Sequence, residues 1–248
     1  MRTNARALGI SAALCGLLAV FIFRRGLSAE YAFFFSAAGT PAPLRGAGAN
    51  IVTWFTLFRD RPLIAFIVFN FFDAVNALLV SILLLPYLCA LFSKNRLLGV
   101  PLLAANFLSP LLFFWSNRST ALYFISRQYF RSHHFEEKLP FLDAGREVLQ
   151  RLVETNSAVN LVGNAALALL LVTGLSLALF RVGKSRKDWP GVVGNALALV
   201  YFPLLALAPR YASVATALST PFLVVWYFFL AVASARGLRL EEGDQPRN

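Results

Sequence analysis

The sequence predicts an all-α protein, a polytopic bundle of about six transmembrane helices with interfacial amphipathic helices in two outer loops. Three observations lead to this fold class: the composition, the length of the apolar runs and the placement of the cations. The chain of 248 residues is 58% hydrophobic and 14% charged, whereas soluble domains are about 45–50% apolar and about 25% charged. No single soluble core could bury that much apolar surface, so the bilayer must solvate most of the fold.

Apolar runs long enough to cross a bilayer recur along the chain. Their residues are 7–23, 63–92, 97–116, 157–180, 189–208 and 211–235. These runs exceed the roughly 9–11 residues of a barrel strand, and backbone inside a bilayer must satisfy its hydrogen bonds internally. The runs are therefore predicted to be helices, and together they form a single transmembrane domain over residues 1–248.

The first run, 7–23, is the shortest and has two interpretations. Arg2 and Arg6 precede it, as cations precede the apolar region of a secretory signal peptide. Arg24 and Arg25 follow it directly, however, and no small-x-small cleavage site is convincing. We therefore prefer an uncleaved first helix.

Prolines lie inside several of the later runs. The run 63–92 is too long for an untilted span and contains Pro86, so a kink or tilt is expected there. The third run contains Pro101 and Pro110, and the fifth contains Pro203. Each proline removes one backbone donor, a loss for which neighbouring helices commonly compensate in a membrane bundle.

The distribution of cations predicts a multi-pass protein of the cell membrane with both termini in the cytoplasm. In this orientation the short cytoplasmic segments, including the tail 236–248, carry dense clusters of cations. The clusters comprise Arg2, Arg6, Lys94, Arg96, Arg181, Lys184, Arg186, Lys187, Arg236, Arg239 and Arg247. The outer loops 24–61 and 117–156 hold as many cations, but long loops count little in the positive-inside rule. Arg24 and Arg25 favour the opposite orientation.

The net charge of +11 does not indicate a nucleic-acid partner. The cations lie at the ends of apolar runs, where they meet anionic lipid headgroups, and no RNA-binding signature accompanies them. The expected partner is the lipid bilayer, and other membrane subunits or a homo-oligomer remain open. Cys15 and Cys89 lie inside apolar runs, where cysteine behaves as a small hydrophobe, so no disulfide framework is expected.

Both outer loops are predicted to lie at the membrane interface. Aromatic residues are dense in 31–58 and 122–130, and such residues favour the headgroup region. Over 141–153, apolar residues recur at helical spacing, with charged and amide residues on the opposite face. This last segment is either an amphipathic surface helix or an extension of the fourth span.

Asp73 is the only ionisable residue well inside a predicted span. A carboxylate in hydrocarbon costs roughly 2.5–3.5 kcal/mol even on the mild insertion scale, so it must face the bundle interior, water or a partner. Asn70 and Asn76 flank it at three-residue spacing, which places all three on one helical face. Other spans offer Asn106, Asn160, Asn164 and Asn195 as partners, and the first three are predicted to complete a polar intramembrane cluster.

This cluster around Asp73 has two interpretations. In the first, a small solute or proton moves through the polar residues, because membrane pathways retain such groups. In the second, amide residues only hydrogen-bond between helices, as they do in many membrane proteins. The second interpretation makes the chain a structural or accessory subunit of a membrane complex.

The chain's only histidines, His133 and His134, lie just before Glu136 and Glu137 in the second outer loop. Imidazoles near carboxylates can bind zinc or transfer protons, which would make the chain a membrane-surface enzyme. Adjacent histidines on a helix point about 100° apart, however, and the His-Glu-x-x-His spacing is absent. A solvated polar corner is the favoured interpretation, with no metal or cofactor expected. The sequence also has no Gly-x-Ser-x-Gly or Cys-x-x-Cys motif, which disfavours an enzyme.

A basic turn and a Trp-Pro-Gly step lead into the fifth span. The segment 141–180 comes before them, and the residues concerned are Arg181, Lys184, Trp189, Pro190 and Gly191. With six spans and a long outer loop before the second, this pattern resembles an uncharacterised bacterial family of six-helix integral membrane proteins. The resemblance implies the same architecture and assigns no activity and no catalytic residue.

Overall fold

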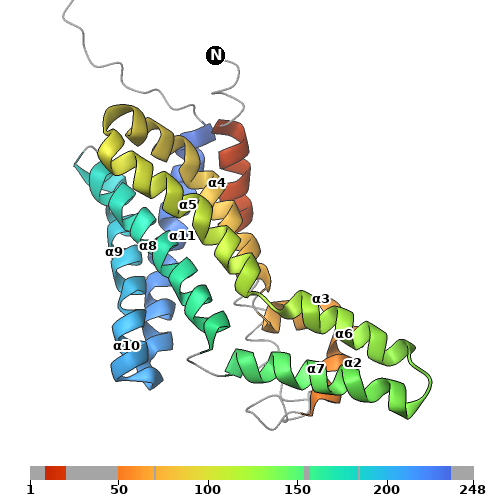
Figure 1. Cartoon of the computed structure of the whole chain (residues 1–248). Coiled ribbons are helices and arrows are strands. Elements are labelled where there is room, and N and C mark those ends of the chain that lie inside the picture. The colour runs from red at the N-terminus through yellow and green to blue at the C-terminus, as the bar shows by residue number, and fades with distance from the viewer. Residues whose placement is uncertain (1–8, 21–49, 70, 154–156, 184, 236–248) are drawn as a thin grey trace, which may run out of the picture. The chain divides into compact units, whose positions relative to one another are not determined.

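The protein is all-helical in the computed structural model (Figure 1). The structure describes residues 9–20, 50–69, 71–153, 157–183 and 185–235. Every regular element within these ranges is a helix, which confirms the predicted all-α class.

Five described segments are long and apolar enough to cross a membrane. They are Phe71–Lys94, Arg96–Arg131, Ala158–Val182, Arg186–Leu207 and Val214–Ala235. Another apolar helix, Gly9–Val20, is shorter. This set of helices fits a multi-pass membrane protein.

The chain divides into two compact units, each with its own interior. Unit 1 comprises Met1–Phe21, Asn76–Pro110 and Leu167–Asn248. Unit 2 comprises Ile22–Val75 and Leu111–Ala166. Three helices contribute residues to both units, namely α4 (Phe71–Lys94), α5 (Arg96–Ser116) and α8 (Ala158–Val182).

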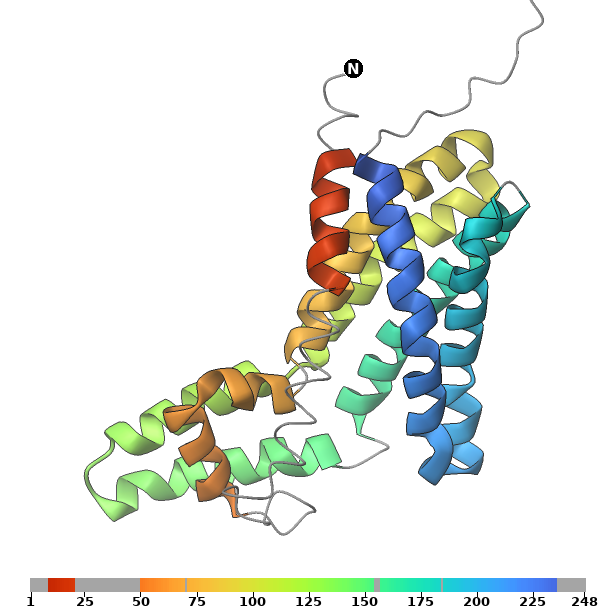
Figure 2. The same cartoon turned by 180° about the vertical axis from the view of Figure 1, so that it is seen from behind.

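Unit 1 is a bundle of helices that are apolar along most of their length. Besides its parts of α4, α5 and α8, its described elements are the helix Gly9–Val20, η2 (Arg186–Asp188), α9 (Trp189–Leu199), α10 (Tyr201–Leu207) and α11 (Pro209–Ala235). Figure 2 shows Gly9–Val20, in red, beside α11, in blue.

The helix Gly9–Val20 packs through a face of small residues. Its buried positions are Gly9, Ala12, Ala13, Gly16 and Ala19. A Cβ atom added at Gly16 would lie only 2.8 Å from Leu83 Cδ1 and 2.9 Å from Ala231 Cβ. The opposite face exposes large residues such as Leu14 and Leu17. Small residues inside and large ones outside are typical of closely packed membrane helices.

Two predicted spans are each divided into two helices. The run 189–208 forms α9 and α10, which meet at Val200. Pro203 cannot donate to the carbonyl four residues earlier, so the ladder breaks in this turn. The run 63–92 forms α3 (Pro62–Val68) and α4. At this break, Asn117 Nδ2 donates to the Phe69 carbonyl at 3.1 Å, which provides a partner for a backbone oxygen at the helix end.

Unit 2 is built around a hairpin of two amphipathic helices, α6 (Ser119–Arg131) and α7 (Phe135–Val153) (Figure 1). The helix α2 (Ile51–Asp60) packs on the hairpin. The core contains Ile51, Phe55, Phe58, Ala65, Leu122 and Leu142. A Cβ at Gly145 would lie 2.5 Å from the Phe55 ring, so glycine lets α2 approach α7 closely. The helix predicted over 141–153 is thus present and starts earlier, at Phe135.

Candidate functional site

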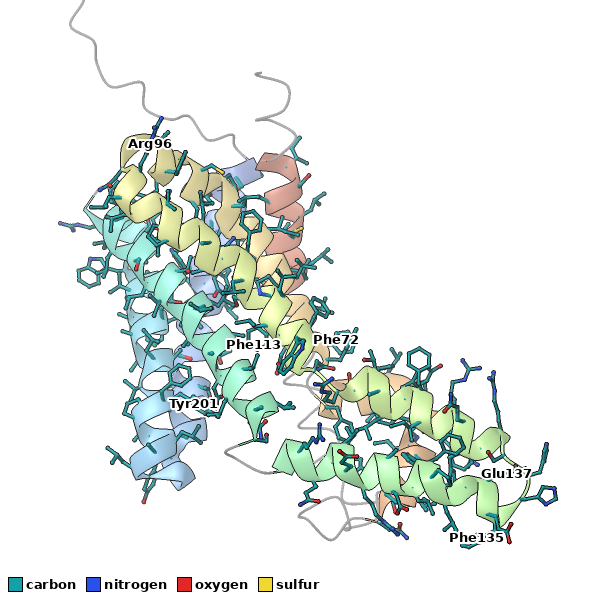
Figure 3. All side chains as sticks on the ribbon, in the orientation of Figure 1. Phe72, Arg96, Phe113, Phe135, Glu137 and Tyr201 are labelled. Carbon is teal, nitrogen blue, oxygen red and sulfur yellow. The ribbon has the colours of Figure 1, made fainter. Side chains whose placement is uncertain are left out.

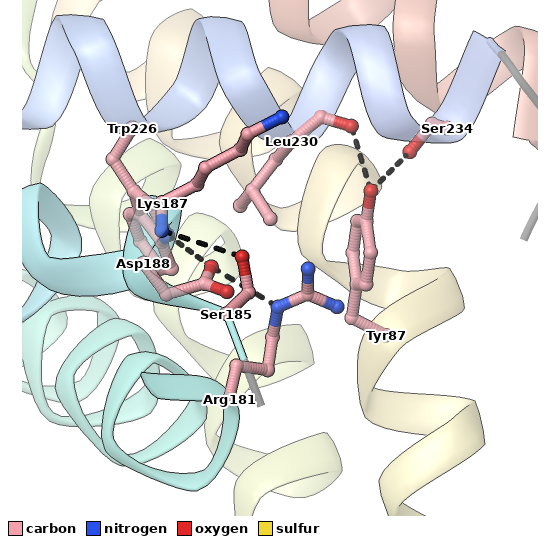
Figure 4. A network of polar contacts seen from close by, with 8 residues as sticks. All are labelled: Tyr87, Arg181, Ser185, Lys187, Asp188, Trp226, Leu230 and Ser234. Atoms are coloured by element: carbon pink, nitrogen blue, oxygen red, sulfur yellow. Dashed lines mark hydrogen bonds and ion pairs between the residues drawn. The ribbon is translucent and has the colours of Figure 1, made fainter. Parts of the chain in front are cut away.

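The most extensive polar network in unit 1 centres on Asp188, whose residue is 2% exposed. Its Oδ1 accepts hydrogen bonds from Arg181 Nε at 3.1 Å and from Trp226 Nε1 at 2.9 Å (Figure 4). These donors come from α8 and α11, while Asp188 itself lies immediately before α9. One carboxylate therefore joins three helices at the same end of unit 1.

Local sequence positions Asp188 at the start of α9. The Ser185 hydroxyl accepts from the Lys187 backbone N–H at 3.3 Å, and the Asp188 N–H donates to the Ser185 carbonyl at 3.2 Å. Pro190 follows in the first turn of α9, where its missing N–H has no intrahelical partner to lose. A short capped turn and a proline thus fix where the helix starts and where the carboxylate lies.

Gly191 lets the Trp226 side chain reach this carboxylate. A Cβ atom at Gly191 would lie 2.4 Å from ring carbons of Trp226, closer than real Cβ contacts allow. The indole therefore lies against the backbone of α9, and its N–H can donate to Asp188. This contact gives a physical reason for the Trp-Pro-Gly step in the sequence.

Tyr87 extends the network to a fourth helix, α4. The Arg181 guanidinium carbon lies 4.5 Å from the centre of the Tyr87 ring, a cation–π distance. The Tyr87 hydroxyl donates to the Leu230 carbonyl at 2.6 Å and lies 3.0 Å from Ser234 Oγ (Figure 4). We call Tyr87, Arg181, Asp188, Trp226 and Ser234 the Asp188 network.

Unit 1 also buries amide side chains outside this network. Asn106 Nδ2 donates to the Ser81 carbonyl at 3.0 Å, and Asn195 Nδ2 donates to the Gly191 carbonyl at 2.7 Å. A Cβ at Gly174 would lie 2.5 Å from Asn195 Oδ1, so this glycine allows α8 to pack directly against the amide. Each of these amides thus donates its N–H group to a backbone carbonyl of a helix, and its side-chain oxygen is buried.

Several buried side-chain oxygens in unit 1 have no hydrogen-bond partner in the part of the chain that the structure describes. They are Asn76 Oδ1, Ser81 Oγ, Asn106 Oδ1, Asp188 Oδ2 and Asn195 Oδ1. All of them can accept a hydrogen bond. A buried polar atom without a partner costs about 1–3 kcal/mol, so such atoms are uncommon and each of them needs a physical explanation.

These oxygens lie at successive depths along the helices. Measured along the axis of α4 at 1.5 Å rise per residue, Ser81 is about 9 Å from Tyr87 and Asn76 is about 16 Å from Tyr87. Along α9, Asn195 lies about 10 Å from Asp188 by the same rise. The unpartnered oxygens therefore extend away from the Asp188 network along α4 and α9.

No family model, curated protein or solved structure matches this chain. Function must therefore be inferred from the chemistry and placement of the side chains.

The residues of the predicted cluster around Asp73 are divided between the two units. Asn76 and Asn106 are buried in unit 1. Asp73, which is exposed, and the half-buried Asn160 and Asn164 belong to unit 2. The remaining member, Asn70, lies outside the described residues. That the six residues act together stays a prediction.

The two histidines lie in the exposed turn between α6 and α7. Glu136 and Glu137 are exposed in the first turn of α7, and Figure 3 shows Phe135 and Glu137 at this end of the hairpin. Within the described ranges, no group of three or more His, Cys, Asp or Glu side chains could hold a metal ion.

Asp188 and Trp226 were not among the site residues predicted from the sequence. Asp188 is the only acid in a turn that also contains Arg181, Lys184, Arg186 and Lys187, and this contrast is the signal that could have found it. An acid just before a helix is also an ordinary capping residue, so the signal is weak. Its partner Trp226 lies in another run, and no local pattern pairs the two residues.

Proposed function

We propose that this chain is a multi-pass cell-membrane protein that moves a small polar solute or protons through the interior of unit 1. The observation that carries the proposal is the series of buried, unpartnered oxygens between Asn76 and Asp188. Because these atoms accept hydrogen bonds, a solute that donates hydrogen bonds would satisfy them one after another. Polar groups inside membrane bundles commonly mark such pathways.

Reconstitution into liposomes tests this proposal. Pyranine inside the vesicles reports proton entry, and light scattering reports entry of glycerol or urea. Replacing Asn106 with Leu removes a buried acceptor, and we expect the flux to fall about tenfold, equivalent to about 1.4 kcal/mol in the barrier. The neighbouring Phe107 is 56% exposed, so Phe107→Leu is the matched control and should keep wild-type flux. Wild-type vesicles no more permeable than empty ones to all three probes would contradict the proposal.

We propose separately that Asp73, on the first turn of α4 in unit 2, is a titratable residue on which transport depends. Asp73→Asn nearly keeps the shape and hydrogen bonding but removes the charge, whereas Asp73→Leu removes both. A proton-coupled carrier should assemble normally with Asn and lose flux. A residue that only links helices should tolerate Asn and lose thermal stability with Leu. If Asp73→Leu is as stable and as active as wild type, Asp73 has neither role.

Six spans, with both termini in the cytoplasm, are part of the proposal. The small-residue packing of Gly9–Val20 within unit 1 supports counting this helix as a retained span. The resemblance to a six-helix bacterial family, which stays a prediction, agrees with that number.

Cysteine labelling tests the orientation. In a background with Cys15 and Cys89 replaced by Ala, an impermeant maleimide applied to intact cells should label Ser36→Cys and Ser132→Cys. It should not label Ser185→Cys until the cells are opened. Labelling of Ser185→Cys in intact cells would reverse the orientation.

The competing function is a structural or accessory subunit of a membrane complex. The Asp188 network favours it, because a polar network that joins four helices would hold a scaffold rigid without any solute. A scaffold predicts no flux in liposomes and a specific membrane partner in cross-linking of the full chain. Flux that depends on Asn106 would argue against a purely structural role.

A further inference from the structure

The helix α6 exposes one continuous face. Its exposed residues are Thr120, Phe124, Arg127, Gln128 and Arg131. Their spacing is helical, so they share one side, while Leu122 and Ser126 are buried on the other. Phe124 is 62% exposed, an unusual position for a large aromatic side chain in a helix whose other face already packs on a core.

This face carries two arginines and no acids. Residues 117–134 contain three arginines and no Asp or Glu. On α7, by contrast, Arg146 pairs with Asp143 and Arg151 pairs with Glu147. Within the described part of the chain, no carboxylate lies within ion-pair distance of Arg127 or Arg131. The hairpin therefore has a basic side on α6 and a charge-balanced side on α7.

Aromatic rings accompany the arginines on α6. The Arg127 guanidinium carbon lies 5.8 Å from the centre of the Tyr123 ring, one turn earlier. Such a pair combines an apolar body with a charged end, which suits the boundary between acyl chains and phosphate groups.

Chain connectivity brings α6 to the membrane surface. Only Asn117 and Arg118 separate it from α5, whose 21 mostly apolar residues are enough to cross a bilayer. Trp115, in the last turn of α5, is 52% exposed, and the Arg118 guanidinium carbon lies 5.1 Å from its ring centre. Exposed tryptophan beside arginine is typical of the membrane–water interface. The first turn of α6 thus starts at that level.

We propose that the exposed face of α6 binds anionic phospholipids. Phe124 inserts among the acyl chains, while Arg127 and Arg131 contact the lipid phosphates. Charge complementarity favours this occupant, because an arginine-bearing face without acids attracts anionic headgroups and the charge-balanced side of α7 does not. This role is independent of solute movement through unit 1.

Spin labels on the full chain in nanodiscs test the position of this face. In the Cys15→Ala, Cys89→Ala background, Phe124→Cys reports α6, and Glu147→Cys on α7 is the matched control. The label at 124 should collide with oxygen in preference to a water-soluble nickel chelate, and the label at 147 should show the reverse. Equal access of the chelate to both positions would overturn the proposal. A label at 124 shielded from both reagents would also overturn it, because protein would then cover the face.

A second measurement tests the headgroup. Spin-labelled phosphatidylglycerol and phosphatidylcholine are compared for association with the wild-type chain, and we expect a preference for phosphatidylglycerol. Replacing Arg127 and Arg131 by Gln should abolish that preference, whereas replacing both by Lys should retain it. The Lys variant also controls for folding, together with an unchanged elution volume for both variants. A preference that survives the Gln variant would overturn the assignment of these arginines.

Discussion

Units 1 and 2 differ in what they bury and expose. Unit 1 buries small and polar residues such as Gly16 and Asn106 among its leucines, and it exposes large apolar side chains such as Leu17 and Phe107. The core of unit 2 is made of aromatic and aliphatic side chains, and its helices α2, α6 and α7 carry charges outside. The ion pairs follow the same rule, because the Arg181–Asp188 pair is largely buried while the pairs of unit 2 are more than half exposed.

This contrast indicates the solvent of each unit. Large apolar side chains on the outside are stable only in lipid, where helices associate through small residues and hydrogen bonds. Charged outer faces over an apolar core are the arrangement for water or the headgroup region. On unit 2, the hydrogen bond from Arg59 lowers the pKa of Asp60, an effect of one neighbouring side chain at an exposed position.

The largest expected effect separates the two kinds of ion pair. Arg181→Met leaves the Asp188 carboxylate, 3% exposed, without its cation, and should destabilise the protein by about 3–5 kcal/mol. Arg151→Met removes an exposed partner of Glu147 and should change stability by less than about 1 kcal/mol. Thermal unfolding in detergent measures both. The double variant Arg181→Met, Asp188→Leu should recover much of the lost stability. Equal losses of stability for Arg181→Met and Arg151→Met would contradict the proposed difference between the two ion pairs.

The next effect tests whether the small-residue face of the first helix lies inside the bundle. Gly16→Leu forces a large side chain against Leu83 and Ala231 and should cost about 3 kcal/mol. Leu17→Ala, on the outer face, should change stability by less than about 1 kcal/mol. Melting temperatures of the purified variants decide between them. An unchanged melting temperature for Gly16→Leu would mean that this helix is not part of the folded bundle.

Replacing glycines that contact aromatic rings should lower stability by a smaller amount in both units. Gly191→Ala meets the Trp226 ring, and Gly145→Ala meets the Phe55 ring, so each should cost about 1–2 kcal/mol by overpacking. Gly183→Ala is the control, because nothing lies within 4 Å of its added Cβ. In unit 1 the ring also donates to Asp188, so Gly191→Ala and Trp226→Phe should be non-additive in a double-mutant cycle. If the two stability changes are strictly additive, the Gly191 contact with the indole does not help to position the hydrogen bond to Asp188.

The smallest expected effect concerns the outer surface of α7. Asp143→Asn removes one charge from an ion pair with Arg146 whose side chains are 72% and 65% exposed. Stability should change by less than about 0.5 kcal/mol, and addition of salt should abolish even that difference. A loss above about 1 kcal/mol would show that this side of unit 2 is shielded from water.

Local patterns in the sequence determined the helical class and the approximate positions of the membrane-length helices. Mean hydropathy over a window and helical periodicity are properties of neighbouring residues, so the runs 97–116 and 157–180 correspond closely to α5 and α8. The same reasoning found the amphipathic helix α7. It placed the breaks less well, since the run 63–92 is two helices, α3 and α4.

The tertiary structure alone decided which polar residues are buried together. Asp188 and Trp226 belong to different helices, and their contact depends on Gly191 being small enough to admit the indole. Asn106 reaches the Ser81 carbonyl across two helices in the same way. Hydropathy places a residue in or near a span, but burial depends on how each helix is rotated about its axis. That rotation is set by packing between segments far apart in the chain, which no local window contains.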